Sequence, residues 1–324
     1  MASKRLVSIA CGFYNNGEFA EETVGCLKAQ DYDNIEIILV DDGSTDDTLE
    51  TLRRFEGDGV TVIAQENQGI GAALHTAFAV AHGEFFAYHE AGDFSFPTRI
   101  SRQIEAFDRD PPIGAVASHV EVQDVDGTVL RIGKPEIGDR LAERLLKQSQ
   151  FSHSEMAYRR SWYERAGGYR AFFRYSEDND LFLRLSEICA FAVVPEILVV
   201  KRHRAGSVTC DPRKTWLARC YRDFAEFCAR ERRAGRGDPL EFHGKAAAFL
   251  RPRSARLADR LARQAWKLIR NGELDIGREI AAHAYREKMT KRSIAALALS
   301  AMPRFIRTIG RSGPDPKVGR PLAR

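Results

Sequence analysis

Apolar runs of strand length alternate with segments of helical periodicity over the first hundred residues. The clearest run, residues 35–40, is almost continuously apolar and ends in Asp41, Asp42 and Gly43. Such a run is typical of a parallel strand that helices cover on both faces of its sheet. The pattern predicts strands over 6–11, 35–40, 60–64 and 85–88, with helices ending near 30 and covering 49–55 and 72–81. This order predicts an α/β fold with a largely parallel sheet.

The pattern changes after residue 115. Two apolar segments, 116–125 and 128–132, flank Asp126-Gly127, which indicates a β-hairpin. Beyond it we expect a strand over 151–158, a short helix over 161–166, a helix that opens at Glu177 and a strand over 191–200.

From about residue 211 the chain reads as helical and basic. Leu257, Leu261, Ala265 and Leu268 fall on one helical face, beside a stripe of arginines and lysines. We therefore divide the chain into an α/β domain over 1–210, a basic helical region over 211–309 and a disordered tail over 310–324.

Charge is distributed unevenly along the 324 residues. Residues 1–200 carry 19 Lys and Arg against 33 Asp and Glu, whereas residues 201–324 carry 30 against 12. An acidic front suits a site that handles metals or hydroxyls, and a basic tail suits an anionic surface.

The six cysteines form no CxxC motif, and the first ten residues lack the apolar core of a signal peptide. The best apolar stretches, 188–200 and 294–302, are too short to span a bilayer. We expect a cytoplasmic protein with reduced thiols, with peripheral contact to the inner face of the plasma membrane as an open alternative.

Chemistry-bearing residues follow the early strands. Asp41 and Asp42 end a strand, where open α/β sheets bind their ligands, and Gly43 permits the sharp turn that follows. Ser44 is placed to cap the next helix. Tyr14 follows the first strand, where its ring can stack on a nucleobase or serve as an ordinary interfacial aromatic.

Six segments resemble, in order and spacing, the family-2 glycosyltransferases of the GT-A fold. They are residues 7–15, 36–44, 67–71, 83–97, 152–168 and 176–185, and the resemblance covers roughly 4–209. It implies a mostly parallel central sheet flanked by helices, with a C-terminal helical extension. It also implies a nucleotide-sugar donor, a divalent metal and transfer to an acceptor hydroxyl with inversion.

The resemblance assigns a donor side. It implies that Tyr14 stacks on the base, that Asp41 accepts the uracil imide hydrogen and that Asp42 lies near the ribose, although Asp42 could equally be a helix cap. The other implied donor-binding residues are Asn15, Asn67, Gly69, Glu90, Arg202 and Arg204.

Two departures from the family pattern affect this side. Residues 90–93 occupy the place of the usual Asp-x-Asp-Asp motif, so the resemblance implies that Asp93 and Glu90 hold Mn²⁺ or Mg²⁺. Gly92, however, stands where the usual metal ligand lies. In addition, Leu74 and His75 lie where the family often has arginine.

Glu177 and Asp178 match the family's acidic pair, and Asp178 is the expected general base. A helix N-terminus favours its ionised form. The alternative is that these carboxylates only cap a helix. His153 and Tyr169 are expected on the acceptor side, although His153 could be an ordinary core histidine.

The sequence thus predicts an inverting glycosyltransferase that uses a UDP-sugar and acts on a saccharide or lipid-linked acceptor in surface polysaccharide or glycolipid synthesis. One alternative is a non-catalytic nucleotide-sugar-binding scaffold, which Gly92 and Leu74 favour. A nucleotidyltransferase is less favoured, because residues 12–17 contain no Lys or Arg.

No nucleic-acid partner is expected. The basic region has two interpretations. Residues 254–271 suit a helical cap on the catalytic domain, whereas residues 293–309 suit an amphipathic anchor on an anionic membrane.

Overall fold

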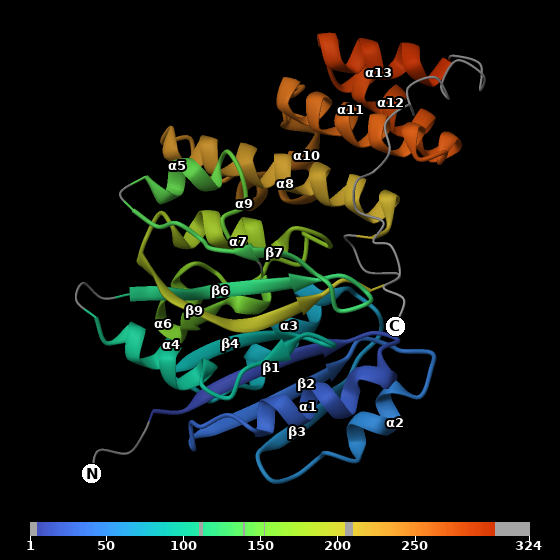
Figure 1. Ribbon diagram of the computed structural model, residues 1–324. Helices are drawn as coiled ribbons and strands as arrows, with labels where there is room; N and C mark the ends of the chain where they lie inside the picture. The colour runs from blue at the N-terminus through green and yellow to red at the C-terminus, as the bar shows by residue number, and fades with distance from the viewer. Residues whose placement is uncertain (1–4, 110–112, 139, 152, 205–209, 302–324) are drawn as a thin grey trace, which may run out of the picture. The chain divides into compact units, whose positions relative to one another are not determined.

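A mixed sheet of nine strands is the framework of the first of two compact units, into which the chain divides between residues 251 and 252 (Figure 1). The computed structural model describes residues 5–109, 113–138, 140–151, 153–204 and 210–301. Within these residues the strand order is β3-β2-β1-β4-β8-β6-β9-β5, and β7 pairs with β6. The strands are β1 (Val7–Phe13), β2 (Ile35–Asp41), β3 (Val60–Ala64), β4 (Phe85–Glu90), β5 (Phe94–Ser95), β6 (Ile113–Gln123), β7 (Val129–Gly133), β8 (Ala157–Arg159) and β9 (Ala190–Arg202).

Strand direction is reversed at β8 and again at the edge strand β5, which is antiparallel to β9. β3, β2, β1 and β4 run parallel, β8 is antiparallel to both β4 and β6, and β6 is parallel to β9. The predicted α/β fold of GT-A type is therefore confirmed, and its sheet is mixed rather than uniformly parallel. The carboxyl ends of β1, β2 and β4 meet at one edge of the sheet.

Helices cover both faces because successive side chains of a strand point to opposite sides. Ile38 and Val40 belong to the core that contains α3 (Ile70–Val80), α7 (Glu177–Leu185) and α8 (Pro212–Arg233). Ile37 and Leu39 belong to the other core, with α1 (Ala20–Lys28), α2 (Thr48–Arg53) and α4 (Arg99–Phe107). The remaining helices of this unit are α5 (Leu141–Leu145), α6 (Arg160–Arg165), α9 (Pro239–His243) and α10 (Ala247–Leu250), with 3₁₀ helices η1 (Gly17–Phe19), η2 (His153–Glu155) and η3 (Gly244–Ala246).

Most predicted elements are present, including the hairpin of β6 and β7. Two expectations were wrong. Within the segment predicted as a strand over 151–158, His153, Ser154 and Glu155 form the 3₁₀ helix η2 and are all buried, and only Ala157–Arg159 pairs as a strand. Ser44 does not cap α2, because its hydroxyl accepts the Asn15 backbone N–H at 2.9 Å and the helix starts at Thr48.

The second unit contains α11 (Ala255–Arg270), α12 (Leu274–Glu287) and α13 (Lys291–Ala301) within its described part. The predicted apolar stripe of α11 is confirmed, because Leu257, Leu261, Ala265 and Leu268 are buried. The predicted tail over 310–324, and the part of the predicted anchor beyond residue 301, lie outside the described residues.

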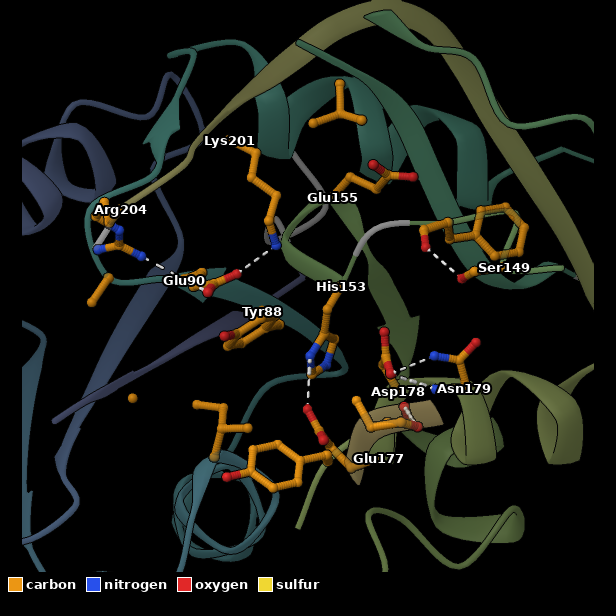
Figure 2. Close-up of a pocket in the computed structure, with 18 of the residues that line it drawn as sticks. Tyr88, Glu90, Ser149, His153, Glu155, Glu177, Asp178, Asn179, Lys201 and Arg204 are labelled. Atoms are coloured by element: carbon orange, nitrogen blue, oxygen red, sulfur yellow. Dashed lines mark hydrogen bonds and ion pairs between the residues drawn. The ribbon is translucent and has the colours of Figure 1, made fainter. Parts of the chain in front are cut away.

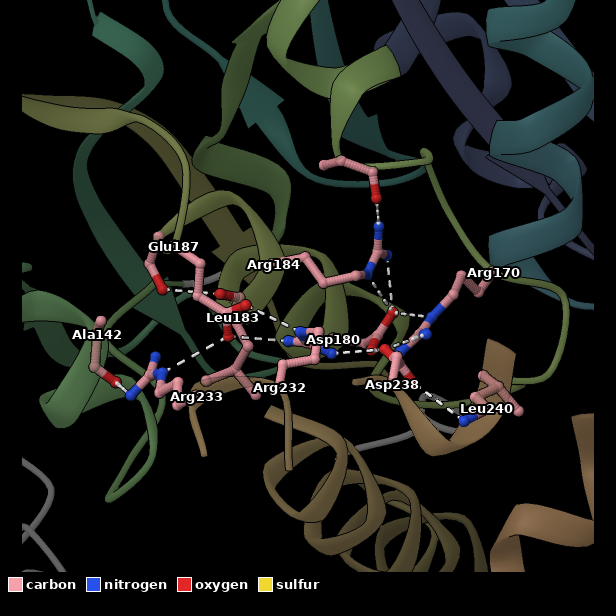
Figure 3. A network of polar contacts seen from close by, with 12 residues as sticks. Ala142, Arg170, Asp180, Leu183, Arg184, Glu187, Arg232, Arg233, Asp238 and Leu240 are labelled. Atoms are coloured by element: carbon pink, nitrogen blue, oxygen red, sulfur yellow. Dashed lines mark hydrogen bonds and ion pairs between the residues drawn. The ribbon is translucent and has the colours of Figure 1, made fainter. Parts of the chain in front are cut away.

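The sequence placed the end of the catalytic domain at residue 210, whereas α8, α9 and α10 belong to the first compact unit. The division of the chain into 1–210, 211–309 and 310–324 stays a prediction. A physical reason for the longer unit is a buried ion-pair network between α7 and the segment that follows α8 (Figure 3).

Asp180 of α7 lies at the centre of this network. Its carboxylate accepts Arg184 Nη2 at 2.7 Å and Arg170 Nε at 2.9 Å. Arg170 and Arg232 both bind Asp238, the N-cap of α9, at 2.8 and 2.7 Å. Burial opposes ionisation of Asp180, but the charges of Arg184 and Arg170 lower its pKa. The network therefore ties α7 to α8 and α9.

We expect Asp180→Asn to lower the free energy of unfolding by about 3–5 kcal/mol, because it leaves buried guanidinium groups without their carboxylate. The difference should be full at neutral pH. It should shrink only below about pH 4, because the folded-state pKa lies below the unfolded value of about 3.9.

Urea unfolding at pH 7 and pH 3 measures this difference. Glu50→Gln, which removes an exposed pair with Arg54, is the matched control and should cost less than about 1 kcal/mol. Equal stability of the two variants at pH 7 would contradict a structural role for the network.

Candidate functional site

One cavity of about 750 Å³ opens at the carboxyl edge of the parallel strands. Its walls come from the segment after β1, from the ends of β4 and β9, from the N-terminus of α7 and from α8. Most of the predicted site residues line it, namely Tyr14, Asn15, Asp42, Glu90, His153, Glu177, Asp178 and Arg204. The topology therefore brings together residues that lie up to 190 positions apart in the chain.

Tyr14 and Asn15 stand at one end of this cavity. The Tyr14 side chain is 47% exposed, which leaves a ring face free for stacking. Asn15 has a φ of 50°, and its side-chain oxygen accepts the Thr45 N–H at 2.8 Å. This bond and the one to Ser44 fasten the loop after β1 to the loop after β2.

Asp41 and Asp42 separate at this edge because adjacent residues of a strand face opposite sides. Asp42 lines the main cavity and accepts three hydrogen bonds, from Gln65 Nε2 at 2.7 Å, Gln68 N at 2.9 Å and Gly69 N at 2.7 Å. Gly69 caps α3, so the Asp42 carboxylate lies at a helix N-terminus, where negative charge is favoured.

Asp41 instead lines a smaller, separate hollow together with Asn67. One of its carboxylate oxygens accepts the Ser44 N–H at 3.2 Å, and the other is buried without a hydrogen-bond partner among the described residues. Gly69 lines neither cavity; its φ of 92° lets its N–H reach Asp42. Asp41 and Asn67 thus line a different hollow from the other cavity-lining donor residues, which are Tyr14, Asn15, Asp42, Glu90 and Arg204.

Glu90 is the centre of a charged cluster at the end of β4 (Figure 2). Its two oxygens face Lys201 Nζ at 2.8 Å and Arg204 Nη2 at 3.8 Å. Burial works against ionisation, but the charges of Lys201 and Arg204 lower the pKa of Glu90 to about 2. Lys201 was missed by sequence reasoning, although it adjoins the predicted Arg202.

Arg202 does not line the cavity. Its side chain pairs with Glu22 at 2.6 Å, and its backbone N–H binds Asp93 at 3.1 Å. Asp93 is buried behind the cavity, and burial together with the charge of Glu90 raises its pKa to about 7.

Glu177 and Asp178 open α7 and face the cavity (Figure 2). Ser176, with a left-handed φ of 58°, donates its hydroxyl to Ala218 O of α8 at 2.9 Å, which anchors the start of the helix. The Asp178 carboxylate accepts the N–H and the side-chain amide of Asn179 at 2.7 and 2.9 Å. These bonds hold the carboxylate at the cavity wall.

His153 links Glu177 to the core. Its Nδ1 lies 3.5 Å from Glu177 Oε1, and its Nε2 lies 2.5 Å from the Tyr169 hydroxyl. The imidazole also packs on Tyr88, with ring centroids 4.0 Å apart. Burial raises the pKa of Glu177 against the opposing effect of His153. Tyr169 therefore supports His153 from behind and does not itself reach the cavity.

Residues 8–167 match the family model described as glycosyl transferase family 2. The putative glycosyltransferase EpsE of Bacillus subtilis is 31% identical over 58% of this chain and 69% of its own length. The chain belongs to glycosyltransferase family 2. It spans about two thirds of the length of this relative, and about the same share of an uncharacterized glycosyltransferase of Rickettsia prowazekii.

Solved structures of GT-A glycosyltransferases show the same fold. Staphylococcus aureus TarS in complex with UDP superposes with a TM-score of 0.57 at 14% identity, over 90% of this chain and 89% of that chain. The Pyrobaculum calidifontis mannosyltransferase PcManGT, in complex with GDP-mannose and Mn²⁺, superposes with a TM-score of 0.53 at 20% identity, over 95% and 84% of the two chains.

The carboxylates of this glycosyltransferase do not fit a divalent ion well. Both Glu90 oxygens face cations, and one Asp93 oxygen accepts the Arg202 N–H. Gly92 supplies no ligand. Among the described residues, no group of three or more His, Cys, Asp or Glu side chains is arranged to hold a metal. The predicted ligand pair is present in the sequence, but its surroundings are cationic.

Proposed function

We propose that this glycosyltransferase moves the sugar of a UDP-sugar to an acceptor hydroxyl with inversion at the anomeric carbon. The observation that supports it is that the stacking residue Tyr14, the carboxylate Asp42 and the carboxylate Asp178 line a single cavity. A binding surface and a base are thereby combined in the space that one sugar nucleotide would occupy. The neighbour TarS binds UDP, which supports this nucleotide for the present chain.

The uracil would lie beside Tyr14. A carboxylate offers about four acceptor positions, and Asp42 uses three of them on N–H groups of the protein. One position remains for the imide hydrogen of uracil. We therefore assign base recognition to Asp42, whereas the sequence-based assignment to Asp41 stays a prediction that the same experiment tests.

Asp178 would act as the general base. The acceptor oxygen bonds to the anomeric carbon while the bond between that carbon and the diphosphate oxygen breaks, and the hydroxyl proton passes to Asp178. This carboxylate lies in the first turn of α7 and is held at the cavity wall by its hydrogen bonds with Asn179. Glu177 and His153 would position the acceptor, since both line the cavity beside Asp178.

A non-catalytic scaffold that binds nucleotide sugars is the second candidate, and Gly92 is the observation that favours it. Such a scaffold would need the Tyr14 end of the cavity to bind the nucleotide, but it would not require Asp178. Measured transfer by the wild-type protein, lost in an Asp178 variant, separates the two.

The acceptor proposal concerns a lipid-linked or polymeric saccharide at a membrane. None of the helices in the described part of the chain combines the length and apolar character needed to cross a bilayer. The α11 helix does present Arg256, Arg263, Lys267 and Arg270 on an exposed face, next to an exposed Trp266. Basic residues beside an interfacial tryptophan suit an anionic lipid surface.

For catalysis, we expect Asp178→Asn to lower the transfer rate at least about 100-fold, because general-base catalysis is worth about 10²–10⁴-fold. UDP affinity should change little, because the loss falls on the transition state. Steady-state kinetics and calorimetry measure the two quantities. Glu164→Gln, on exposed α6 surface, is the control; a variant that keeps a tenth of the wild-type rate would rule out Asp178 as the base.

For the donor, UDP should bind more tightly than GDP, and Asp42→Asn should weaken UDP binding by about 10-fold or more through loss of a charge-assisted hydrogen bond. Asp41→Asn should have the smaller effect, since Asp41 lies outside the main cavity. Calorimetry with UDP, GDP and uridine tests this order. A larger effect at Asp41 would restore the sequence-based assignment, and tighter GDP binding would overturn the choice of UDP.

For the membrane, the protein should float together with anionic vesicles at low salt. Binding to the vesicles should weaken as salt screens the charges. Arg263→Glu with Lys267→Glu should reduce binding strongly, because each basic residue contributes about 1 kcal/mol at an anionic surface. Charge reversal of Arg53 and Arg54, at the C-terminal end of α2, is the matched control. Binding that resists both salt and charge reversal, or no binding, would leave α11 as a helical cap only.

A further inference from the structure

A guanidinium group fills the space in which the family motif has a carboxylate. Gly92 has a φ of 83°, and a Cβ atom built on it would lie 1.9 Å from Arg204 Nη1 and 2.7 Å from Arg204 Cζ. Position 92 therefore admits no side chain while Arg204 holds this position. The absence of a side chain at position 92 and the place of the Arg204 guanidinium are therefore linked.

Arg204 is held there but not fully paired. Its guanidinium lies over the Phe19 ring, 5.0 Å from the centroid, and its Nη2 faces Glu90 at 3.8 Å. Nε and Nη1 are buried without a hydrogen-bond partner among the described residues. Buried donors without partners are rare, and a charged one is costly. The group is thus arranged as a binding site for acceptor atoms that the chain itself does not supply.

Lys201 is a second cation on the same wall of the cavity. It is a fifth exposed, and its bond to Glu90 fixes the ammonium at the end of β9. The Glu90 carboxylate lies between the two cations and faces each of them with a different oxygen. Two cations thus flank the Glu90 carboxylate at this point of the cavity, close to where Asp93 and Glu90 were expected to hold a metal.

We propose that Lys201 and Arg204 bind the diphosphate of the donor directly and take the place of the divalent metal, so that nucleotide binding is independent of metal. This inference rests on the proposed UDP-sugar function. An arginine fork matches two phosphate oxygens, and its charge-assisted bonds are among the strong ones in proteins. Glu90 then positions the two cations and is not a metal ligand.

Calorimetry of UDP and uridine on the full chain, in EDTA and in Mn²⁺, tests the proposal. UDP should bind with the same affinity in both solutions within about 2-fold. The Mn²⁺ resonance in electron paramagnetic spectra should be the same with and without protein, both for Mn²⁺ alone and for Mn²⁺ with UDP. UDP binding that appears only with Mn²⁺, together with a change of the Mn²⁺ resonance when protein is added, would overturn the proposal and leave the donor function intact.

Arg204→Gln and Lys201→Gln should each weaken UDP binding in EDTA by about 10- to 100-fold and leave uridine binding unchanged, because uridine has no phosphate. Gly92→Asp gives an independent route, since it places a carboxylate against the guanidinium, and it should weaken UDP in the same way. Arg102→Gln, which alters an exposed pair on α4, is the matched control, and thermal unfolding checks that each variant is folded.

Unchanged UDP affinity in folded Arg204→Gln and Gly92→Asp would contradict the role of the guanidinium. If wild-type protein binds neither UDP nor uridine in either solution, the proposed function fails, and this inference fails with it. Uridine binding that persists without any gain from the diphosphate would overturn the inference alone.

Discussion

The ion pairs around Asp180 are the constraint on which the geometry of the cavity depends. Asp178 and Asp180 belong to the same first turn of α7, but one faces the cavity and the other is buried among arginines. A carboxylate that is buried and paired fixes the helix, because releasing it would expose uncompensated charge. The accessible carboxylate two residues earlier is therefore held in place by the buried one. Arg232 of α8 and Asp238, the N-cap of α9, take part in this network, so residues beyond 210 support the site from behind as well as lining it through α8.

The same separation of roles occurs at the end of β2. Alternation along the strand sends Asp41 and Asp42 to opposite sides, and only Asp42 reaches both the cavity and the N-terminus of α3. Two acidic residues that are adjacent in sequence thus lie in two different environments. Which of the two residues binds the ligand depends on which side chain the pleat of the strand directs toward it. This cannot be predicted from the spacing of the motif alone.

Local patterns allowed much of the fold to be predicted. The apolar run over 35–40, the Asp126-Gly127 turn and the leucine stripe of α11 each depend on residues close in sequence, and each has its predicted structure. The strand predicted over 151–158 was wrong because consecutive residues of η2 are buried together, which an alternating pattern does not describe. Lys201 was missed because its partner Glu90 lies 111 positions away, and only the pairing of distant strands brings the two side chains together.

The position of Gly92 shows how a departure from a motif is to be interpreted physically. Taken alone, a glycine in place of a metal ligand indicates a weakened site. Its backbone conformation and the absence of a Cβ, however, are what allow the guanidinium of Arg204 to approach. The negative charge of a departing diphosphate can be balanced by any well-placed cation, and an arginine fork does so with hydrogen bonds as well as charge. Because the chain itself supplies this cation, binding of the diphosphate needs no free metal. The glycine at position 92 and the guanidinium of Arg204 therefore both favour binding without metal. The residue that seems to be missing from the motif is therefore best interpreted together with the residue that occupies its space.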